Sequence, residues 1–276
     1  MSALIYLYLT ATLLFWSSME VLTKPLMSQV DPFFLTFFRF FVGGVFLLVF
    51  VRRKIPFKDI LSLALVGSIN GVLSMSLLQL SVKFSNASTA ATLMATNPLF
   101  VTVFSLILGK EKLSVKRFLS VAIGLVGIMI LSYGRIEGDS IVGLLLGIGA
   151  AITFALYAVL MRDFTLKYGS LDATAVSIFS AGLIYGLLLI LTRNLRIPQI
   201  NIPQWLILIY AGVFVTGLAY VTYFKAMEKL GPSRTSLVFY LKPVVASFLA
   251  LWLLSEPIGA FKIAGTGVIV LALLLR

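Results

Sequence analysis

The stretch IVGLLLGIGAAITFALYAVLM, residues 141–161, contains no charged side chain. A helix needs about 20 mostly apolar residues to cross the hydrocarbon core of a bilayer, and this stretch is long enough to do so. Similar apolar runs lie on both sides of it along the chain. The sequence therefore predicts an all-α integral membrane protein with ten transmembrane helices, near residues 3–22, 32–51, 60–82, 88–108, 117–133, 141–161, 173–192, 204–226, 233–254 and 260–275.

The composition excludes several classes of protein. Of the 276 residues, 60% are hydrophobic and only 12% are charged, whereas a soluble domain carries about a quarter charged residues. Cysteine and histidine are both absent, so we expect no disulfide, no metal site and no cofactor. The sequence also lacks a Walker-type phosphate loop and a glycine-framed catalytic serine with a base. These absences argue against an ATP-driven pump and against an enzyme.

The basic residues predict the orientation of the chain. The net charge of +12 comes mainly from Lys and Arg in short loops between the apolar runs. This placement indicates membrane anchoring, so no nucleic-acid partner is expected. If the N-terminus is inside, most of these residues fall on cytoplasmic loops. The positive-inside rule then predicts a multi-pass protein of a prokaryotic cell membrane with both termini in the cytoplasm.

The two halves of the chain resemble one another. At one constant offset, the matched pairs are Ser88 and Ser233, Pro98 and Pro243, Thr102 and Ser247, Glu111 and Glu256, and Arg117 and Lys262. We expect one five-helix repeat over residues 1–138 and a second over residues 139–276. Because five is odd, the second copy enters the membrane upside down. Inverted repeats are typical of transporters whose binding site lies near the midplane, so the predicted fold has two inverted repeats around a central cavity.

Short motifs recur in a fixed order along the chain. They are FWSS at 15–18 followed by Lys24, FFRF at 37–40, TNPL at 96–99 with GKE at 109–111, ALY at 155–157, and YLKPV at 240–244 with SEP at 255–257. Over essentially its whole length the chain resembles the EamA-like ten-helix exporters of the drug/metabolite transporter superfamily. The resemblance implies a basket-shaped bundle, alternating access, and a central cavity lined mainly by the first, third, fourth, sixth, eighth and ninth helices. The family often has a small or neutral residue where this chain has Glu20, so a coupling role for this carboxylate is not implied by the resemblance.

Three charged residues lie inside the predicted helices, where each costs on the order of 2.5 kcal/mol or more at the bilayer centre. Glu20 is a candidate for substrate binding or for proton coupling, and the alternative is an ion pair with Lys24 one turn later. Lys242 precedes Pro243, whose missing N–H weakens the helix, and it could bind an anionic substrate group or form a salt bridge with Glu20. Arg39 is expected to hold two helices together through a carboxylate or carbonyl partner.

Polar and aromatic side chains well inside the helices are the other candidates for substrate contact. Amides must find hydrogen-bond partners in lipid, and a tyrosine hydroxyl far from the interface also needs one. The predicted substrate-binding residues are Trp16, Glu20, Asn70, Asn97, Tyr157, Tyr220, Tyr223, Tyr240 and Lys242, with Pro98 and Pro243 as hinges. Phe239 is assigned to core packing, and Glu111 and Glu256 are assigned to helix capping or loop bridging.

These features favour a secondary active transporter that moves a small polar metabolite out of the cell, with amino acids or related compounds as the first candidates. The alternatives are an exporter of cationic drugs and, in another class, a passive channel or scramblase. A membrane-embedded enzyme fits the composition poorly. The expected partners are a small-molecule substrate and membrane lipid, with a proton as the candidate coupling ion, in a monomer or a homodimer.

Overall fold

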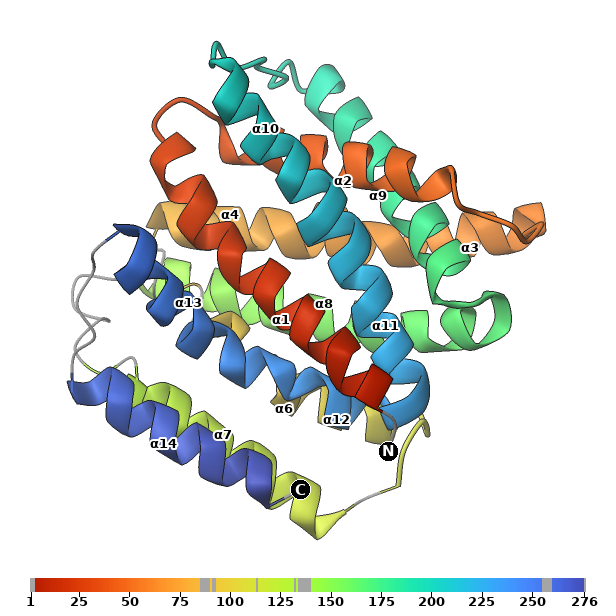
Figure 1. The fold of residues 1–276 in the computed structure, drawn as a ribbon. Coiled ribbons are helices and arrows are strands. Elements are labelled where there is room, and N and C mark those ends of the chain that lie inside the picture. Colours follow the sequence, from red (N-terminus) through yellow and green to blue (C-terminus); the bar gives the residue numbers. More distant parts are fainter. Residues whose placement is uncertain are drawn as a thin grey trace.

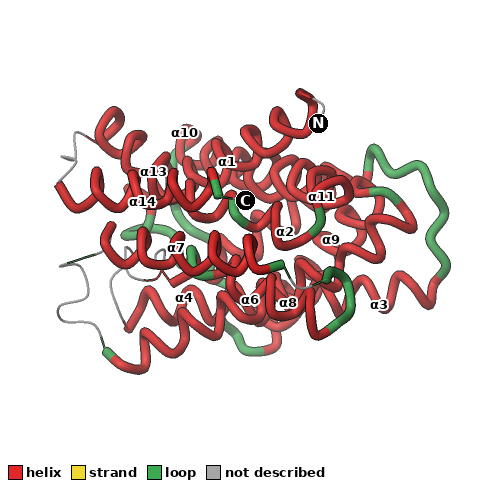
Figure 2. The backbone as a smooth tube through the Cα atoms, turned by 90° about the horizontal axis from the view of Figure 1, so that it is seen from below, coloured by secondary structure: helices red, strands yellow, loops and turns green. Residues whose placement is uncertain are grey.

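The computed structural model describes residues 3–84, 90, 93–112, 114–131, 133, 140–254 and 260–275. The side chains of Glu20, Lys24, Arg117, Leu131, Ala246, Ala250, Leu254 and Lys262 lie outside this description. Within the described ranges every regular element is a helix (Figures 1 and 2). The prediction of an all-α protein is therefore confirmed.

Six of the described helical runs are long and apolar enough to cross a membrane. They are α1 (Ala3–Thr23), α3 to α4 (Phe57–Phe84), α8 (Ile141–Tyr168), α9 (Ser170–Leu191), α10 to α11 (Ile202–Leu230) and α12 to α13 (Pro232–Leu253). The shorter apolar helices are α2 (Pro32–Leu48), α6 (Asn97–Ile107), α7 (Val115–Leu131) and α14 (Ala260–Leu274). Together these elements correspond in order to the ten predicted membrane spans.

Two of the spans are not α-helical throughout. A π-helical segment, η2 (Ile69–Ser74), joins α3 (Phe57–Ser68) to α4 (Met75–Phe84). A second one, η3 (Ala211–Leu218), joins α10 (Ile202–Tyr210) to α11 (Ala219–Leu230). A π-helical turn uses i to i+5 hydrogen bonds and is often found at functional sites. Both segments lie in the middle of their spans, in the third helix of each half.

Some boundaries differ from the predictions because two glycines allow very short connections. Helix α8 continues to Tyr168, well beyond the predicted end at Met161, and only Gly169 separates it from α9. Gly231 likewise separates α11 from α12 (Pro232–Ser236). Gly169 has φ of +89° and Gly231 has φ of +81°, a conformation that only glycine adopts without strain. The chain therefore reverses direction with almost no loop.

Helices α2 and α9 approach each other closely across the two halves. A Cβ placed on Gly44 would lie 2.5 Å from Cα of Phe179, and one on Gly182 would lie 2.7 Å from the backbone N of Phe41. The rings of Phe41 and Phe179 are 6.1 Å apart. Gly44 and Gly182 are 138 positions apart, as are Phe41 and Phe179. The second helix of one half thus meets the second helix of the other through reciprocal contacts.

The other helix contacts come in pairs that are related by interchanging the two halves. Helix α1 packs on α11 and α13, and α8, the first helix of the second half, packs on α4 and α6. Helices α7 and α14 lie side by side at one edge of the bundle (Figure 1). Each contact thus has a counterpart with the halves interchanged. The predicted boundary at residues 138 and 139 lies outside the described residues and stays a prediction.

Candidate substrate-binding site

A cluster of aromatic rings surrounds Trp16 of α1. Trp16 is buried, and its ring centroid lies 5.0 Å from Tyr223, 5.3 Å from Tyr220, 5.1 Å from Phe239 and 6.1 Å from Phe154. The ring of Tyr157 joins the same cluster through Tyr220, at 6.3 Å. We call these six residues the aromatic cluster. It brings together α1, α8, α11 and α13, so four of the predicted site residues, Trp16, Tyr157, Tyr220 and Tyr223, lie together.

The orientation of the Trp16 ring depends on the π-helical segment η3. The indole Nε1 donates a hydrogen bond to the carbonyl oxygen of Val215 at 3.1 Å. Val215 lies within η3, where the changed hydrogen-bond register makes carbonyl groups available to side chains. An indole N–H buried in the bundle needs such an acceptor. The irregular backbone therefore fixes the central ring of the cluster.

The cluster also contains polar groups that lack hydrogen-bond partners. Asn70, in η2, donates from Nδ2 to the hydroxyl of Tyr220 at 3.0 Å, but the other end of its amide has no partner among the described residues. The hydroxyl of Tyr223 likewise has no partner there, and the hydroxyl of Tyr157 lies near Asn70 and Ser177 without forming a hydrogen bond of normal geometry. All three side chains are fully buried. Because each unsatisfied buried group costs about 1–3 kcal/mol, the cluster can gain stability by binding a polar molecule.

Asn97 lies beside this cluster and not within it. Its Nδ2 donates to the carbonyl oxygen of Ala151 in α8 at 3.1 Å, and its Oδ1 has no partner in the described part of the chain. Ala151 is about one helical turn from Phe154 of the aromatic cluster. Asn97 therefore joins α6 to α8 and leaves one acceptor atom next to the cluster.

The two predicted hinge prolines occupy different positions. Pro98 is the second residue of α6, after a turn at Ala95 and Thr96, and a proline there interrupts no helical hydrogen bond. Pro243 lies inside α13 (Val238–Leu254). The carbonyl oxygen of each proline accepts a hydrogen bond at 2.8 Å from the hydroxyl four residues later, Thr102 or Ser247. The local structure at these positions is thus partly equivalent in the two halves.

Tyr240 lies in another part of the bundle. Its hydroxyl donates to the carbonyl oxygen of Val121 in α7 at 2.8 Å. Its ring fills the space over Gly124, where an added Cβ would lie 2.2 Å from Cε2. Tyr240 belongs to a hydrophobic cluster with Val121, Ile128 and Ile269, separate from the rings around Trp16. The structure therefore does not bring this predicted site residue to the aromatic cluster.

We expect Tyr240→Phe to affect stability and not ligand binding. The change removes one hydrogen bond, which contributes about 0.5–1.5 kcal/mol, and keeps the ring that packs on Gly124. The melting temperature of the purified protein should fall by only a few degrees. Ligand affinity measured on the same variant should stay within about twofold of the parent protein. A loss of affinity greater than the loss seen for Tyr220→Phe would return Tyr240 to the site.

The charged residues inside the spans are only partly described. The side chain of Glu20 lies outside the described residues. Lys242 is half-buried, and its backbone carbonyl accepts a hydrogen bond from Ser17 at 3.2 Å, which places this part of α13 against α1. The proposed pair of Glu20 and Lys242 therefore stays a prediction.

Arg39 has contacts that the sequence did not predict. Its side chain is only 6% exposed. Its NH1 and NH2 groups each lie 2.8 Å from a thioether sulfur, one of Met19 and one of Met75. The guanidinium also lies over the ring of Phe40 at 5.3 Å. The sequence did contain a signal that this position is special, because an arginine within a run of phenylalanines is costly in lipid unless it has a function.

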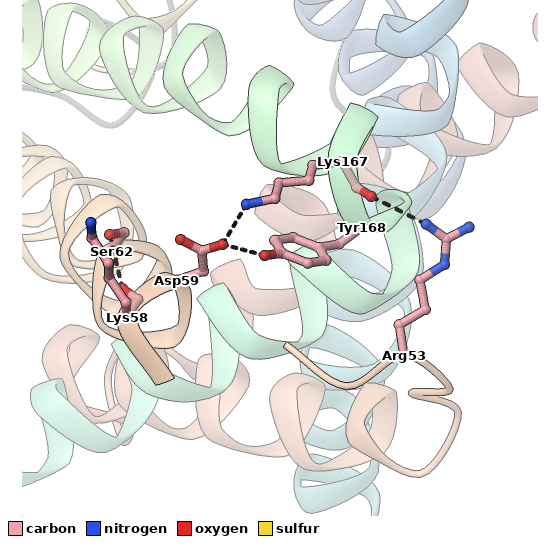
Figure 3. Close-up of polar contacts among 6 residues, drawn as sticks. All are labelled: Arg53, Lys58, Asp59, Ser62, Lys167 and Tyr168. Carbon is pink, nitrogen blue, oxygen red and sulfur yellow. Dashed lines mark hydrogen bonds and ion pairs between the residues drawn. The ribbon is translucent and has the colours of Figure 1, made fainter. Parts of the chain in front are cut away.

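One end of the bundle, which we call the basic end, carries a network of polar contacts around Asp59 and Asp172. Asp59 accepts hydrogen bonds from Lys167 Nζ at 2.6 Å and from the hydroxyl of Tyr168 (Figure 3). Asp172 accepts from the backbone N–H groups of Arg52 and Arg53, both at 3.2 Å. These contacts connect the loop between α2 and α3 and the first turn of α3 to the end of α8 and the start of α9.

Further contacts at the basic end join α6 to its neighbours. Lys110 Nζ and Asp163 Oδ2 are 2.5 Å apart. Glu111 accepts a hydrogen bond from Ser233 in α12, in agreement with its predicted bridging role, whereas Glu256 lies outside the described residues. The basic end is therefore held together by side-chain contacts between both halves.

Comparisons with known proteins agree on one family. The model of the EamA-like transporter family matches the chain twice, over residues 3–133 and 141–276. An uncharacterized transporter of Clostridium kluyveri is 29% identical over 275 residues, which is 94% of this chain and 88% of the relative. A second uncharacterized transporter, from Archaeoglobus fulgidus, is 27% identical over 99% of this chain and 96% of its own length.

More distant proteins are also similar to this chain, in sequence or in fold. A chloroplastic WAT1-related protein of Arabidopsis thaliana is 22% identical over 95% of this chain and 66% of its own length. A crystal structure with 20% sequence identity has a TM-score of 0.81 and covers all of this chain, which shows that the two proteins have the same fold. With two family matches that span nearly the whole sequence, the chain belongs to the EamA-like transporter family.

Proposed function

We propose that this multi-pass membrane protein is a secondary active transporter that binds a small polar metabolite in the aromatic cluster. The observation that carries the proposal is the set of three fully buried polar atoms, Asn70 Oδ1 and the hydroxyls of Tyr157 and Tyr223, that form no hydrogen bond of normal geometry with the described residues. A substrate can satisfy these groups while the rings pack against its apolar part. Amino acids and related compounds combine these two properties and are the first candidates.

Alternating access and export are part of the same proposal. The contacts of Asp59, Asp172 and Glu111 hold the basic end together, and transport would require them to break and form again in each cycle. The positive-inside rule favours the basic end as the cytoplasmic side, with both termini in the cytoplasm of a prokaryotic cell. Export then begins when this end opens to admit substrate. Glu20 is the candidate for proton coupling.

The test uses Trp16 as its own reporter. The chain has three tryptophans, so Trp205→Phe and Trp252→Phe in one protein leave Trp16 as the only source of indole fluorescence. We expect an amino acid with an apolar side chain to change this fluorescence saturably. Adding Asn70→Leu should weaken binding by about tenfold or more, because the contact to Tyr220 and the second end of the amide are both lost. Adding Tyr240→Phe serves as the matched control.

Two results would count against the proposal. If Asn70→Leu and Tyr240→Phe change ligand affinity equally, the binding site is not at the aromatic cluster. If the protein in vesicles shows no saturable counterflow of a ligand that binds it, a channel or scramblase becomes the better assignment.

A second candidate function, export of cationic drugs, is favoured by the rings themselves. Aromatic faces attract cations, with tryptophan the most effective, and the cluster combines Trp16 with five other rings. Tetraphenylphosphonium therefore belongs among the ligands used with the Trp16 reporter. Binding of this cation together with no response to any amino acid would favour drug export.

A further inference from the structure

We propose that Thr174 and Ser177 of α9 contact the substrate as it passes between the basic end and the aromatic cluster. Their hydroxyls lie on one face of α9 together with that of Ser170, and we call these three residues the hydroxyl line. This inference rests on the proposed function, because it supplies the route to the same site. It also adds α9 to the helices that the family resemblance implies as the lining of the cavity.

Ser170, Thr174 and Ser177 share one face because they are spaced four and then three residues apart. At about 100° per residue, their side chains point within about 60° of one another, and the helical rise spreads them over about 10 Å along the axis. All three side chains are buried. The hydroxyl line thus extends from the start of α9, at the basic end, toward the middle of the membrane.

Each end of the hydroxyl line meets a polar group of another helix. Ser170 donates a hydrogen bond to Glu228 Oε1, near the end of α11. Ser177 lies near the hydroxyl of Tyr157, which belongs to the aromatic cluster. It also lies against α3, since a Cβ placed on Gly67 would be 2.7 Å from Ser177 Oγ. The line therefore connects a carboxylate at the basic end with the proposed binding site.

The hydroxyls of Thr174 and Ser177 are available to a ligand. A serine or threonine within a helix often bonds the carbonyl oxygen four residues earlier, as Thr36 does with Pro32 at 2.9 Å. Thr174 Oγ1 and Ser177 Oγ are fully buried and form no hydrogen bond of normal geometry with the described residues, and Ser105 of α6 is the other serine or threonine of that part of the chain with this property. Helix packing alone does not require such hydroxyls, which favours a contact with a polar molecule or with water.

The hydroxyl line is closed in this conformation. Thr174 and Ser177 are 0% exposed. Helices α3 and α11 both pack on α9, and Leu63 of α3 and Phe224 and Met227 of α11 are fully buried in the hydrophobic cluster that includes the aromatic rings. Opening the basic end must separate α9 from at least one of these helices. Water and substrate then reach a face of α9 that offers hydroxyl groups.

Single cysteines in the full-length chain test the route, because the native sequence contains no cysteine. Thr174→Cys and Ser177→Cys each place one thiol on the hydroxyl line. Ser120→Cys is the matched control, because Ser120 is equally buried but lies in α7, where its hydroxyl donates to the carbonyl oxygen of Ala272 at 2.7 Å. Cysteine differs from serine only by sulfur in place of oxygen, so the variants should fold.

The first readout is the rate of labelling by a water-soluble methanethiosulfonate. The cysteine thiolate attacks the sulfenyl sulfur of the reagent, a disulfide forms and methanesulfinate leaves. We expect the thiols at positions 174 and 177 to react about tenfold faster or more than the thiol at position 120, because the open conformation is sampled as a minor state. All three variants should react completely after unfolding in detergent.

The second readout is transport by the labelled protein. In vesicles, labelling of Thr174→Cys should abolish counterflow of phenylalanine, and dithiothreitol should restore it by reducing the disulfide. This recovery shows that the labelled protein is folded. Bound phenylalanine should also slow the labelling of Ser177→Cys, beside Tyr157, and leave the labelling of Ser120→Cys unchanged.

Each contrary result has a distinct meaning. Equal labelling rates at positions 174, 177 and 120, together with a saturable response of Trp16 to a ligand, would overturn the inference and leave the proposed function intact. Unchanged counterflow after labelling of Thr174→Cys would show that water reaches α9 but substrate does not, which also overturns it. If no ligand changes Trp16 fluorescence and none shows counterflow, the proposed function fails and this inference fails with it.

Discussion

Gly182→Leu is expected to lower the melting temperature of the purified protein by about 10 °C or to prevent its folding. The first carbon of the new side chain would already lie 2.7 Å from the backbone N of Phe41 in α2. A backbone atom cannot rotate away as a side chain can, so α2 and α9 must move apart. Overpacking of this kind costs about 1–3 kcal/mol and sometimes more, and here it separates the two halves.

Gly267→Leu is the matched control for this prediction. Gly267 lies in α14 (Ala260–Leu274), where a Cβ would meet nothing within 4 Å. The same substitution there should change the melting temperature by no more than a few degrees. Equal effects of the two substitutions, measured by thermal unfolding in the same detergent, would show that the contact between α2 and α9 is not under steric constraint.

Asp172→Ala is expected to open the basic end. Asp172 is only 6% exposed and accepts two backbone hydrogen bonds from Arg52 and Arg53. It also lies in the first turn of α9, where a negative charge interacts favourably with the helix dipole. Hydrogen bonds to a charged group contribute about 1.5–3 kcal/mol each. Losing them should release the loop between α2 and α3 from α9.

The absence of native cysteine makes this opening measurable. Thr174 lies near the start of α9 and is fully buried. Because the native chain contains no cysteine, Thr174→Cys provides a single thiol. A water-soluble maleimide should react with it about tenfold faster or more when Asp172→Ala is also present. Asp163→Ala is the control, because Asp163 is 54% exposed in its pair with Lys110 and such exposed pairs contribute only about 0–1 kcal/mol. Similar rates for both carboxylate variants would contradict a special role for Asp172.

The sequence was sufficient to locate the helices, because apolar runs as long as the bilayer is thick have few alternatives. It also placed Trp16, Asn70, Tyr157, Tyr220 and Tyr223 in one site, and the structure brings these side chains together. Their common signal was a hydrogen-bonding group far from the membrane interface. The need of that group for a hydrogen-bond partner follows from the residue type and its position in the sequence.

The sequence alone did not show which face of its helix each residue occupies. Tyr240 and Phe239 are neighbours on α13, yet Phe239 lies against Trp16 and Tyr240 lies against Gly124 of α7. Adjacent residues on a helix point about 100° apart, so choosing between them requires the rotation of the helix about its axis. A helix that is apolar on all sides carries no periodic signal that sets this rotation.

The π-helical segments could not be predicted from the sequence either. Residues 69–74 and 211–218 contain no proline and no charged side chain that would mark a break in the helix. Their altered register is accompanied by contacts to distant parts of the chain, such as the bond from Trp16 to Val215 and the bond from Asn70 to Tyr220. Local propensity cannot report a backbone conformation that tertiary contacts maintain.

The meeting of Gly44 with Phe179 and of Gly182 with Phe41 has a mechanical consequence. The two contacts are reciprocal, because the glycine of each half meets the phenylalanine of the other half. The contact as a whole therefore stays the same when the two halves exchange their conformations. A rocking motion that opens one end and closes the other can therefore leave it nearly unchanged. The crossing of α2 and α9 would then serve as a fulcrum, with the distances that change during the cycle growing toward the two membrane surfaces.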